Sequence, residues 1–159
     1  DAGKTWRLLV TFSRPQITLD DIIVDVEDSN LIYVSGHRHL EPGGFMYSED
    51  AGQSWKEAKD LRNEPIHSLA QSKSNPNTLL AGGNGKVFIS YNKGKDWKRI
   101  TDSNVAFSAQ IVNSAEFNPS DANNIYVGTT WRPYKSTDGG KTWKLVSKGM
   151  IDDSDIFAI

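Results

Sequence analysis

The stretch KSTDGGKTWKLV, Lys135 to Val146, determines how the rest of the sequence is interpreted. It places Ser136, Asp138, two glycines and Trp143 between apolar segments that are typical of strands. Serine and aspartate side chains accept hydrogen bonds from turn amides, and glycine adopts positive φ without a steric penalty. A tryptophan ring can be buried between sheets while its N–H finds an acceptor. The stretch therefore predicts a structural hairpin turn rather than a catalytic loop.

The same pattern recurs along the chain. SEDAGQSW (48–55) and STDGGKTW (136–143) are complete, SYNKGKDW (90–97) is a variant, and DAGKTW (1–6) lacks the serine. The period is about 40–50 residues, which indicates a repeat architecture. The residues expected to build the turns are Ser48, Asp50, Gly52, Trp55, Ser90, Asn92, Gly94, Trp97, Ser136, Asp138, Gly140 and Trp143.

Each repeat also contains four short strand-like segments. They are rich in Val, Ile, Tyr, Phe and Thr, and Gly, Pro, Asn or Asp bounds them. No long segment has the apolar spacing of a helix. Four antiparallel strands per repeat form the blade of a β-propeller, so we predict an all-β chain of three complete blades with partial blades at both ends. The expected boundaries are 1–20, 21–64, 65–109, 110–149 and 150–159.

The motif Ser-x-Asp-x-Gly-x-Thr-Trp resembles the Asp-box, or bacterial neuraminidase repeat (BNR). Propellers with this repeat include sialidases, xyloglucan-degrading glycoside hydrolases, sortilin-type receptors and photosystem II assembly factor-like proteins. The resemblance implies a propeller whose ligand sites lie on the face opposite the Asp-boxes, near the central axis. It also implies an extracytoplasmic location, which means secreted, periplasmic or lumenal.

Composition excludes several classes of function. The net charge is −2, with 18 basic and 20 acidic residues, which argues against a nucleic-acid-binding face. The chain has no cysteine and therefore no disulfide or thiolate metal site. No apolar run is long enough to span a membrane. We expect no cofactor, no nucleic-acid partner and no membrane span.

Propeller topology predicts where a binding site would lie. The turns between strands 1 and 2 and between strands 3 and 4 share one face, and the Asp-boxes belong to it. The loops between strands 2 and 3 and the connections between blades lie on the opposite face. The candidate binding residues there are His37, Arg38, His39, Glu41, Trp131, Arg132, Tyr134, Asp152 and Asp153. The connections also bring Asp20, Asp21, Arg62 and His67 to this face.

A metal site and a sugar site are both open alternatives among these residues. His37 and His39 alternate along an extended segment, so both rings lie on one side, but a third ligand could only be guessed as Glu41. No known zinc spacing is matched, and we expect no metal. Trp131 next to Arg132 fits a stacked sugar, a protein contact or a packed rim residue equally well.

Catalysis would require a pair of carboxyl groups across a cleft. Asp20 or Asp21 with Asp152 or Asp153 supplies them only if the ring brings these loops together. The arginines form no recognisable sialidase triad, and no Phe/Tyr-Arg-Ile-Pro sequence is present.

We therefore expect a non-catalytic interaction or assembly module that binds another protein or the rest of its own propeller. The alternatives are a glycan-binding module and a glycoside hydrolase. Three blades cannot close a ring, so we expect the chain to belong to a longer propeller or to be completed by a partner.

Overall fold

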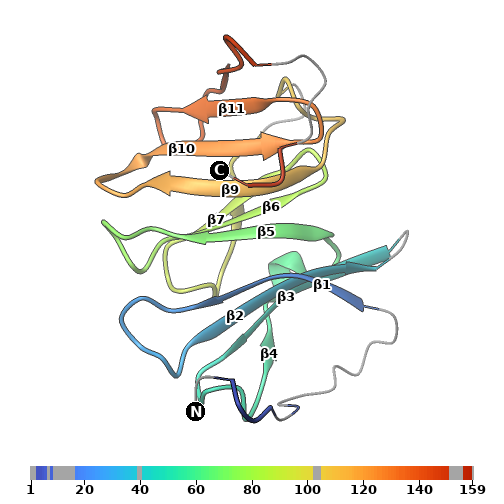
Figure 1. The fold of residues 1–159 in the computed structure, drawn as a ribbon, viewed down its shortest axis with the longest axis vertical. Coiled ribbons are helices and arrows are strands. Elements are labelled where there is room, and N and C mark those ends of the chain that lie inside the picture. Colours follow the sequence, from blue (N-terminus) through green and yellow to red (C-terminus); the bar gives the residue numbers. More distant parts are fainter. Residues whose placement is uncertain are drawn as a thin grey trace.

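The computed structural model describes residues 3–6, 8, 17–38, 41–101, 105–150 and 156–158. Three four-stranded antiparallel sheets stand next to one another in chain order (Figure 1). The described residues contain no α-helix and one 3₁₀ turn, η1 (Lys59–Leu61). The prediction of an all-β partial propeller of about three blades is confirmed.

Each sheet is a meander in which sequence neighbours pair. The first blade consists of β1 (Ile17–Val24), β2 (Ile32–Arg38), β3 (Glu41–Ser48) and β4 (Lys56–Glu57). The second consists of β5 (Ile66–Gln71), β6 (Leu79–Gly83), β7 (Val87–Ser90) and β8 (Lys98–Arg99). The third consists of β9 (Val112–Asn118), β10 (Asp121–Thr129), β11 (Pro133–Ser136) and β12 (Lys144–Leu145). β1 begins before the expected boundary at residue 21, because Ile17 to Leu19 continue to pair with the end of β2.

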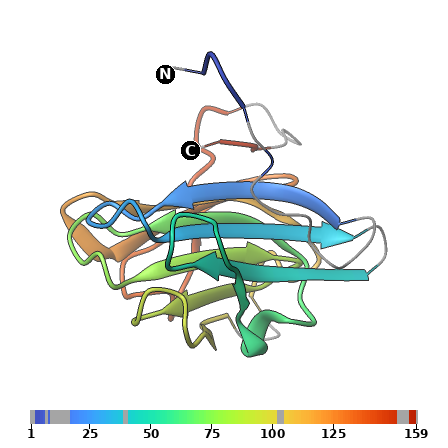
Figure 2. The ribbon, with the colours of Figure 1, turned by 90° about the horizontal axis from the view of Figure 1, so that it is seen from below.

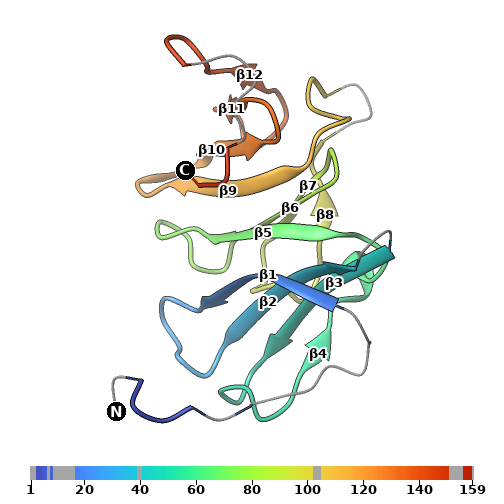
Figure 3. The same cartoon turned by 45° about the vertical axis from the view of Figure 1, so that its right-hand side comes forward.

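The first strand of each blade forms one edge of its sheet, and these edges adjoin. β5 packs against both β1 and β9. Figure 2 shows β1, β2 and β3 side by side from this edge outward, and Figure 3 brings the short outer strands β4, β8 and β12 into view. This is the arrangement of propeller blades, whose first strands face a central axis.

Two apolar cores lie between the sheets. In β6, Leu79 and Ala81 belong to the core shared with the first blade, and Leu80 belongs to the core shared with the third. This follows from the two-residue period of a strand, which sends successive side chains to opposite faces. The second blade therefore packs against a neighbour on both faces, and every residue of β6 (LLAGG) and β7 (VFIS) is buried.

The Asp-box turn is held by its own side chains. The Ser48 hydroxyl accepts the Gly52 N–H at 2.7 Å and donates to Asp50 Oδ1 at 2.7 Å. The Trp55 indole N–H donates to the Gly52 carbonyl at 3.1 Å. Hydrogen bonds from the Ser54 hydroxyl and amide hold the pKa of Asp50 at about 2. These bonds close the turn within the chain.

In the variant box at 90–97, the donor and the acceptor of one side-chain hydrogen bond are exchanged. Asn92 Oδ1 accepts from the Ser90 hydroxyl and from the Asp96 N–H, each at 3.0 Å. Its Nδ2 group donates to Asp96 Oδ2 at 2.7 Å. In the box at 136–143, by contrast, the Thr142 hydroxyl donates to Asp138 Oδ2 at 2.6 Å. The two changes at 92 and 96 therefore compensate each other.

The boxes share one rim with the turns between the first and second strands of each blade. The N–H groups of Ala51, Lys93 and Gly139 donate to the carbonyls of Asn30, Asn77 and Asn123 at 2.9–3.0 Å. The three bonds are equivalent, one per blade, and place both kinds of turn on one face. In Figure 1 the β1–β2, β5–β6 and β9–β10 turns all lie on the left.

Gly94 and Gly140 also join neighbouring blades. Gly94 has φ 81°, and a Cβ there would lie 2.7 Å from Cζ of Phe45 in the first blade. A Cβ at Gly140 would lie 2.3 Å from Cδ1 of Ile100. The glycine is thus required both by the turn conformation and by close packing.

Asp25 connects the first two blades by hydrogen bonds. Its carboxylate accepts from the Tyr33 hydroxyl and the Gln71 amide, each at 2.7 Å, and from the Lys93 ammonium at 3.2 Å. Burial alone would raise the pKa of Asp25. The donors from Tyr33, the Glu27 amide, Gln71 and Lys93 outweigh burial and hold it at about 2. Asp25 is therefore a charged link within the blade interface.

The outer face of the first blade differs from the faces inside the stack. Ile22 is 65% exposed, whereas Leu69 and Ala115, at the same position of the second and third blades, are each 6% exposed. The strand register shows that the three positions are equivalent. Near the start of each first strand, its pairing with the second strand shifts by one residue, and Ile22, Leu69 and Ala115 are each the second residue to pair after that shift. The first blade thus presents an interface-type surface to solvent.

Candidate functional site

The first strand of every blade contains a one-residue bulge at the same position. The register jumps from Leu19 to Asp21, from Ile66 to Ser68 and across Val112 and Ser114, which leaves Asp20, His67 and Asn113 unpaired. A bulge redirects the side chain of its extra residue. The three bulges therefore place one polar side chain per blade at equivalent points along the inner edge.

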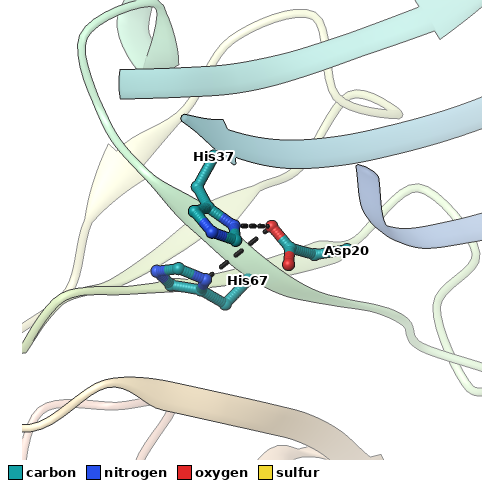
Figure 4. Close-up of side chains that lie close together, drawn as sticks. All are labelled: Asp20, His37 and His67. Carbon is teal, nitrogen blue, oxygen red and sulfur yellow. Dashed lines mark hydrogen bonds and ion pairs between the residues drawn. The ribbon is translucent and has the colours of Figure 1, made fainter. Parts of the chain in front are cut away.

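Asp20 and His67 meet His37, which lies near the end of β2 (Figure 4). His37 Nδ1 lies 2.6 Å from Asp20 Oδ2, and His67 Nδ1 lies 3.7 Å from the same oxygen. The two imidazole centroids are 4.7 Å apart, with the planes inclined by 47°. We call these three residues the Asp20–His37–His67 cluster. It spans the first two blades.

Neighbouring residues orient His67 and keep Asp21 out of the cluster. His67 Nε2 lies 3.1 Å from Oδ1 of Asn84, the residue that follows β6. Asp21 does not join the cluster, because its Oδ2 accepts the Leu69 N–H at 2.9 Å. Between 13 and 31% of each cluster side chain is exposed, so water can reach the site.

The structure places the other predicted site residues separately. Trp131, after β10, is 52% exposed, and Arg132 follows it as a half-buried residue. Tyr134 lies elsewhere than expected. It is 7% exposed and packs on Phe107 with ring centroids 5.0 Å apart. Its position in β11 turns the ring into the core, so Tyr134 does not belong to a binding surface.

Several predicted residues are described in part or not at all. Arg38 ends β2, and Glu41 begins β3. His39, Asp152 and Asp153 lie outside the described residues. The pairing of His37 with His39 and the carboxyl pair across the ring therefore stay predictions.

The sequence predicted that His37, Asp20 and His67 lie on the same face, but it did not predict that they contact one another. The expected partners of His37 came from its own loop, whereas the structure brings partners from β1 and β5. The repeat did align two members of the cluster, because Asp20 and His67 occupy the same position in successive units. The strand register is what reveals that this position is a bulge.

A groove of about 370 Å³ lies on the opposite rim, between the Asp-boxes at 48–55 and 90–97. Among the described residues, Glu49 is the one carboxylate that lines it, and Glu49 is paired with Lys56 and, at 3.1 Å, with Lys95. Glycoside hydrolysis needs two carboxyl groups. The described lining of this groove therefore does not supply that pair. Its lining consists of Leu31, Tyr47, Glu49, Asn77, Tyr91, Asn92, Lys93 and Lys95.

The four-stranded blades and the repeated Ser–Asp–Gly–Trp turns define an Asp-box propeller of the bacterial neuraminidase repeat type. The family model described as "Sortilin, neurotensin receptor 3" matches residues 43–152, which is more than half of the chain. The chain belongs to this sortilin family. No curated protein matches it in sequence.

Solved structures agree with the fold. An ancestral GH74 enzyme superposes with a TM-score of 0.68 and 26% identity, over 81% of this chain and 18% of that one. YCF48 from Cyanidioschyzon merolae gives 0.66 and 21%, over 86% and 39% of the two chains. YCF48 bound to a D1 peptide gives 0.64 and 16%, over 82% and 40%. The chain thus spans less than half the length of each of these proteins.

Within the described part of the chain, no helix has the length and apolar character needed to cross a membrane.

Proposed function

We propose that this chain is a non-catalytic interaction module within a larger Asp-box propeller, and that it binds a protein partner through the face opposite the Asp-boxes. One observation carries the proposal. The described aspartates on that face are engaged by the chain itself, Asp20 by His37 and Asp21 by the Leu69 amide, while Trp131 stands exposed. Such a surface favours recognition over acid–base chemistry, since exposed tryptophan is a frequent contact residue at interfaces.

One of the similar structures is consistent with a protein or peptide ligand. It is YCF48 with a D1 peptide, so a propeller of this fold accommodates a peptide. Another is an enzyme of the GH74 class, so the fold alone does not decide between binding and catalysis. We infer an extracytoplasmic location from the sortilin family, and immunoblotting of fractionated source cells tests it. Signal confined to the cytoplasmic fraction would contradict this location.

Binding screens distinguish the functions. The purified chain is applied to a peptide array, a glycan array and a set of aryl glycosides and xyloglucan oligosaccharides. We expect peptide hits that weaken by about tenfold or more in the W131A variant, in line with the loss of an aromatic contact. Tyr91, exposed next to the Asp-box groove, provides the matched control, since Y91A removes an aromatic ring from the other rim.

Two results would overturn the proposal. Turnover of a glycoside that the D20N variant loses would make the chain a hydrolase. A response confined to the glycan array and lost in W131A would favour the second candidate, a sugar-binding module. The exposed Trp131 is the observation that favours this second candidate, because sugars stack on exposed indole rings.

A further inference from the structure

We propose that Asp20, His37 and His67 form a zinc-binding site that joins the first and second blades. The ligand atoms of these three residues all lie within 4.8 Å of one another. They come from β1, β2 and β5, so the fold rather than a local motif assembles them. This inference is independent of the proposed partner binding.

The distances suit a tetrahedral ion after small side-chain rotations. Zinc bonds of about 2.0–2.1 Å place neighbouring ligand atoms roughly 3.3 Å apart. The distances from Asp20 Oδ2 to the two Nδ1 atoms are 2.6 Å for His37 and 3.7 Å for His67, on either side of that value. Three protein ligands leave a fourth position, which the partial exposure of the cluster opens to water.

Asn84 orients His67 for this role. When His67 Nε2 carries the ring proton, it donates to Asn84 Oδ1 at 3.1 Å. Nδ1 then presents a lone pair to the Asp20 carboxylate at 3.7 Å. Two acceptors that face each other in this way are stabilised by a cation between them. Histidines that bind metals usually donate their second nitrogen to such an oxygen.

The ligand types select the kind of ion. Two imidazoles and one carboxylate suit zinc and similar divalent transition ions, whereas calcium and magnesium prefer oxygen ligands alone. The repeat supplies a comparison within the chain. Between the second and third blades the equivalent positions hold His67, Asn84 and Asn113, and two of these are amides. At these positions, the interface between the first and second blades therefore has three potential metal ligands, whereas the interface between the second and third blades has one.

Calorimetric titration of the tag-free, chelator-treated chain with zinc chloride tests the proposal. We expect one equivalent bound with micromolar affinity or better and a rise in the midpoint of thermal unfolding, because an ion that binds the folded chain more tightly than the unfolded chain stabilises the fold. Magnesium and calcium chloride should produce neither effect. H37A and H67A should each weaken binding at least about 100-fold, and N84A should weaken it by about tenfold.

His39 is the matched control, because it is the third histidine of the chain and neighbours His37 in sequence. The H39A variant should bind zinc as the unsubstituted chain does. Affinity weaker than about 1 mM, full binding by H67A, or loss of binding in H39A would each overturn the assignment. If H67A does not fold, X-ray absorption of the zinc-loaded natural sequence decides instead. Two imidazoles in the first shell support the site, and fewer contradict it.

Discussion

At the scale of single residues, the Asp-box is a small closed set of hydrogen bonds. Its serine and aspartate satisfy the turn amides, and its tryptophan returns an N–H to the glycine carbonyl. The variant box shows that the arrangement of donors and acceptors, rather than the residue types, is what the turn requires. Asn92 and Asp96 exchange donor and acceptor and keep the bond between them.

A double-mutant cycle at this box tests the compensation. N92D should place two carboxylates where Asn92 Nδ2 now donates to Asp96 Oδ2, and should lower the free energy of unfolding by about 1 kcal/mol. Adding D96T should restore most of the loss, because a threonine hydroxyl then donates as Thr142 does in the box at 136–143. Urea unfolding followed by tryptophan fluorescence measures each variant. Additive effects, with no recovery in the double variant, would refute the compensation.

At the scale of elements, the strands of neighbouring blades are joined by apolar packing and by a few directed polar links. Asp25, the residue that follows β1, is hydrogen-bonded to Gln71 at the end of β5 and to Lys93 in the Asp-box at 90–97. The same carboxylate accepts from Tyr33 within its own blade. One buried charge therefore links two sheets, and its removal should destabilise the interface between the first and second blades.

The pKa of Asp25 gives this link a pH dependence. Its value falls from 3.8 to about 2 on folding, so the ionised form is favoured in the native state. The stabilisation is fully present above about pH 4 and is lost as the pH falls through about 2. It amounts to about 2 kcal/mol at neutral pH.

The D25N variant tests this link. It should be less stable than the natural sequence by about that amount at pH 7, and the difference should shrink towards pH 2. Chemical unfolding at pH 7, 4 and 2 measures the difference. Y33F is the control, since it removes one donor and keeps the charge. A gap between the natural sequence and D25N that stays constant across this range would show that the charge of Asp25 does not contribute.

At the scale of the whole molecule, the stack of blades has an apolar interface wherever two sheets meet and a similar surface on the first blade. Ile22 occupies the position at which Leu69 and Ala115 are buried. Val24 and Leu19 are also more than half exposed on β1. If the chain is part of a larger propeller, as proposed above, another blade should cover this surface, since the same strand position is covered by a blade at both interfaces between the described blades.

Charge substitution on the two kinds of surface distinguishes them. I22K should change the free energy of unfolding of this chain by less than about 0.5 kcal/mol, as expected for an exposed position, and should reduce self-association. L69K, at the equivalent buried position, should destabilise the chain by several kcal/mol because it buries an unpaired charge. Thermal unfolding and sedimentation velocity provide the two readouts. A loss of stability in I22K comparable to that in L69K would mean that Ile22 already lies in a core.

The repeat in the sequence determined the class of fold, the number of complete blades and the rim that carries the Asp-boxes. It could do so because each turn is closed by residues close together in the chain, such as Ser48, Asp50 and Gly52. The same locality explains what could not be predicted. Tyr134 was expected on a loop and lies in the core, because the register of β11 decides which face a side chain takes.

Only the tertiary structure brought Asp20, His37 and His67 together. Their meeting depends on bulges in β1 and β5 and on the contact between two blades. The repeat aligns Asp20 with His67, but the sequence alone shows neither the bulges nor the contact. Local hydrogen bonding can be inferred from residues a few positions apart. Contacts between strands of different sheets depend on register and on the packing angle of the blades, which many side chains set jointly.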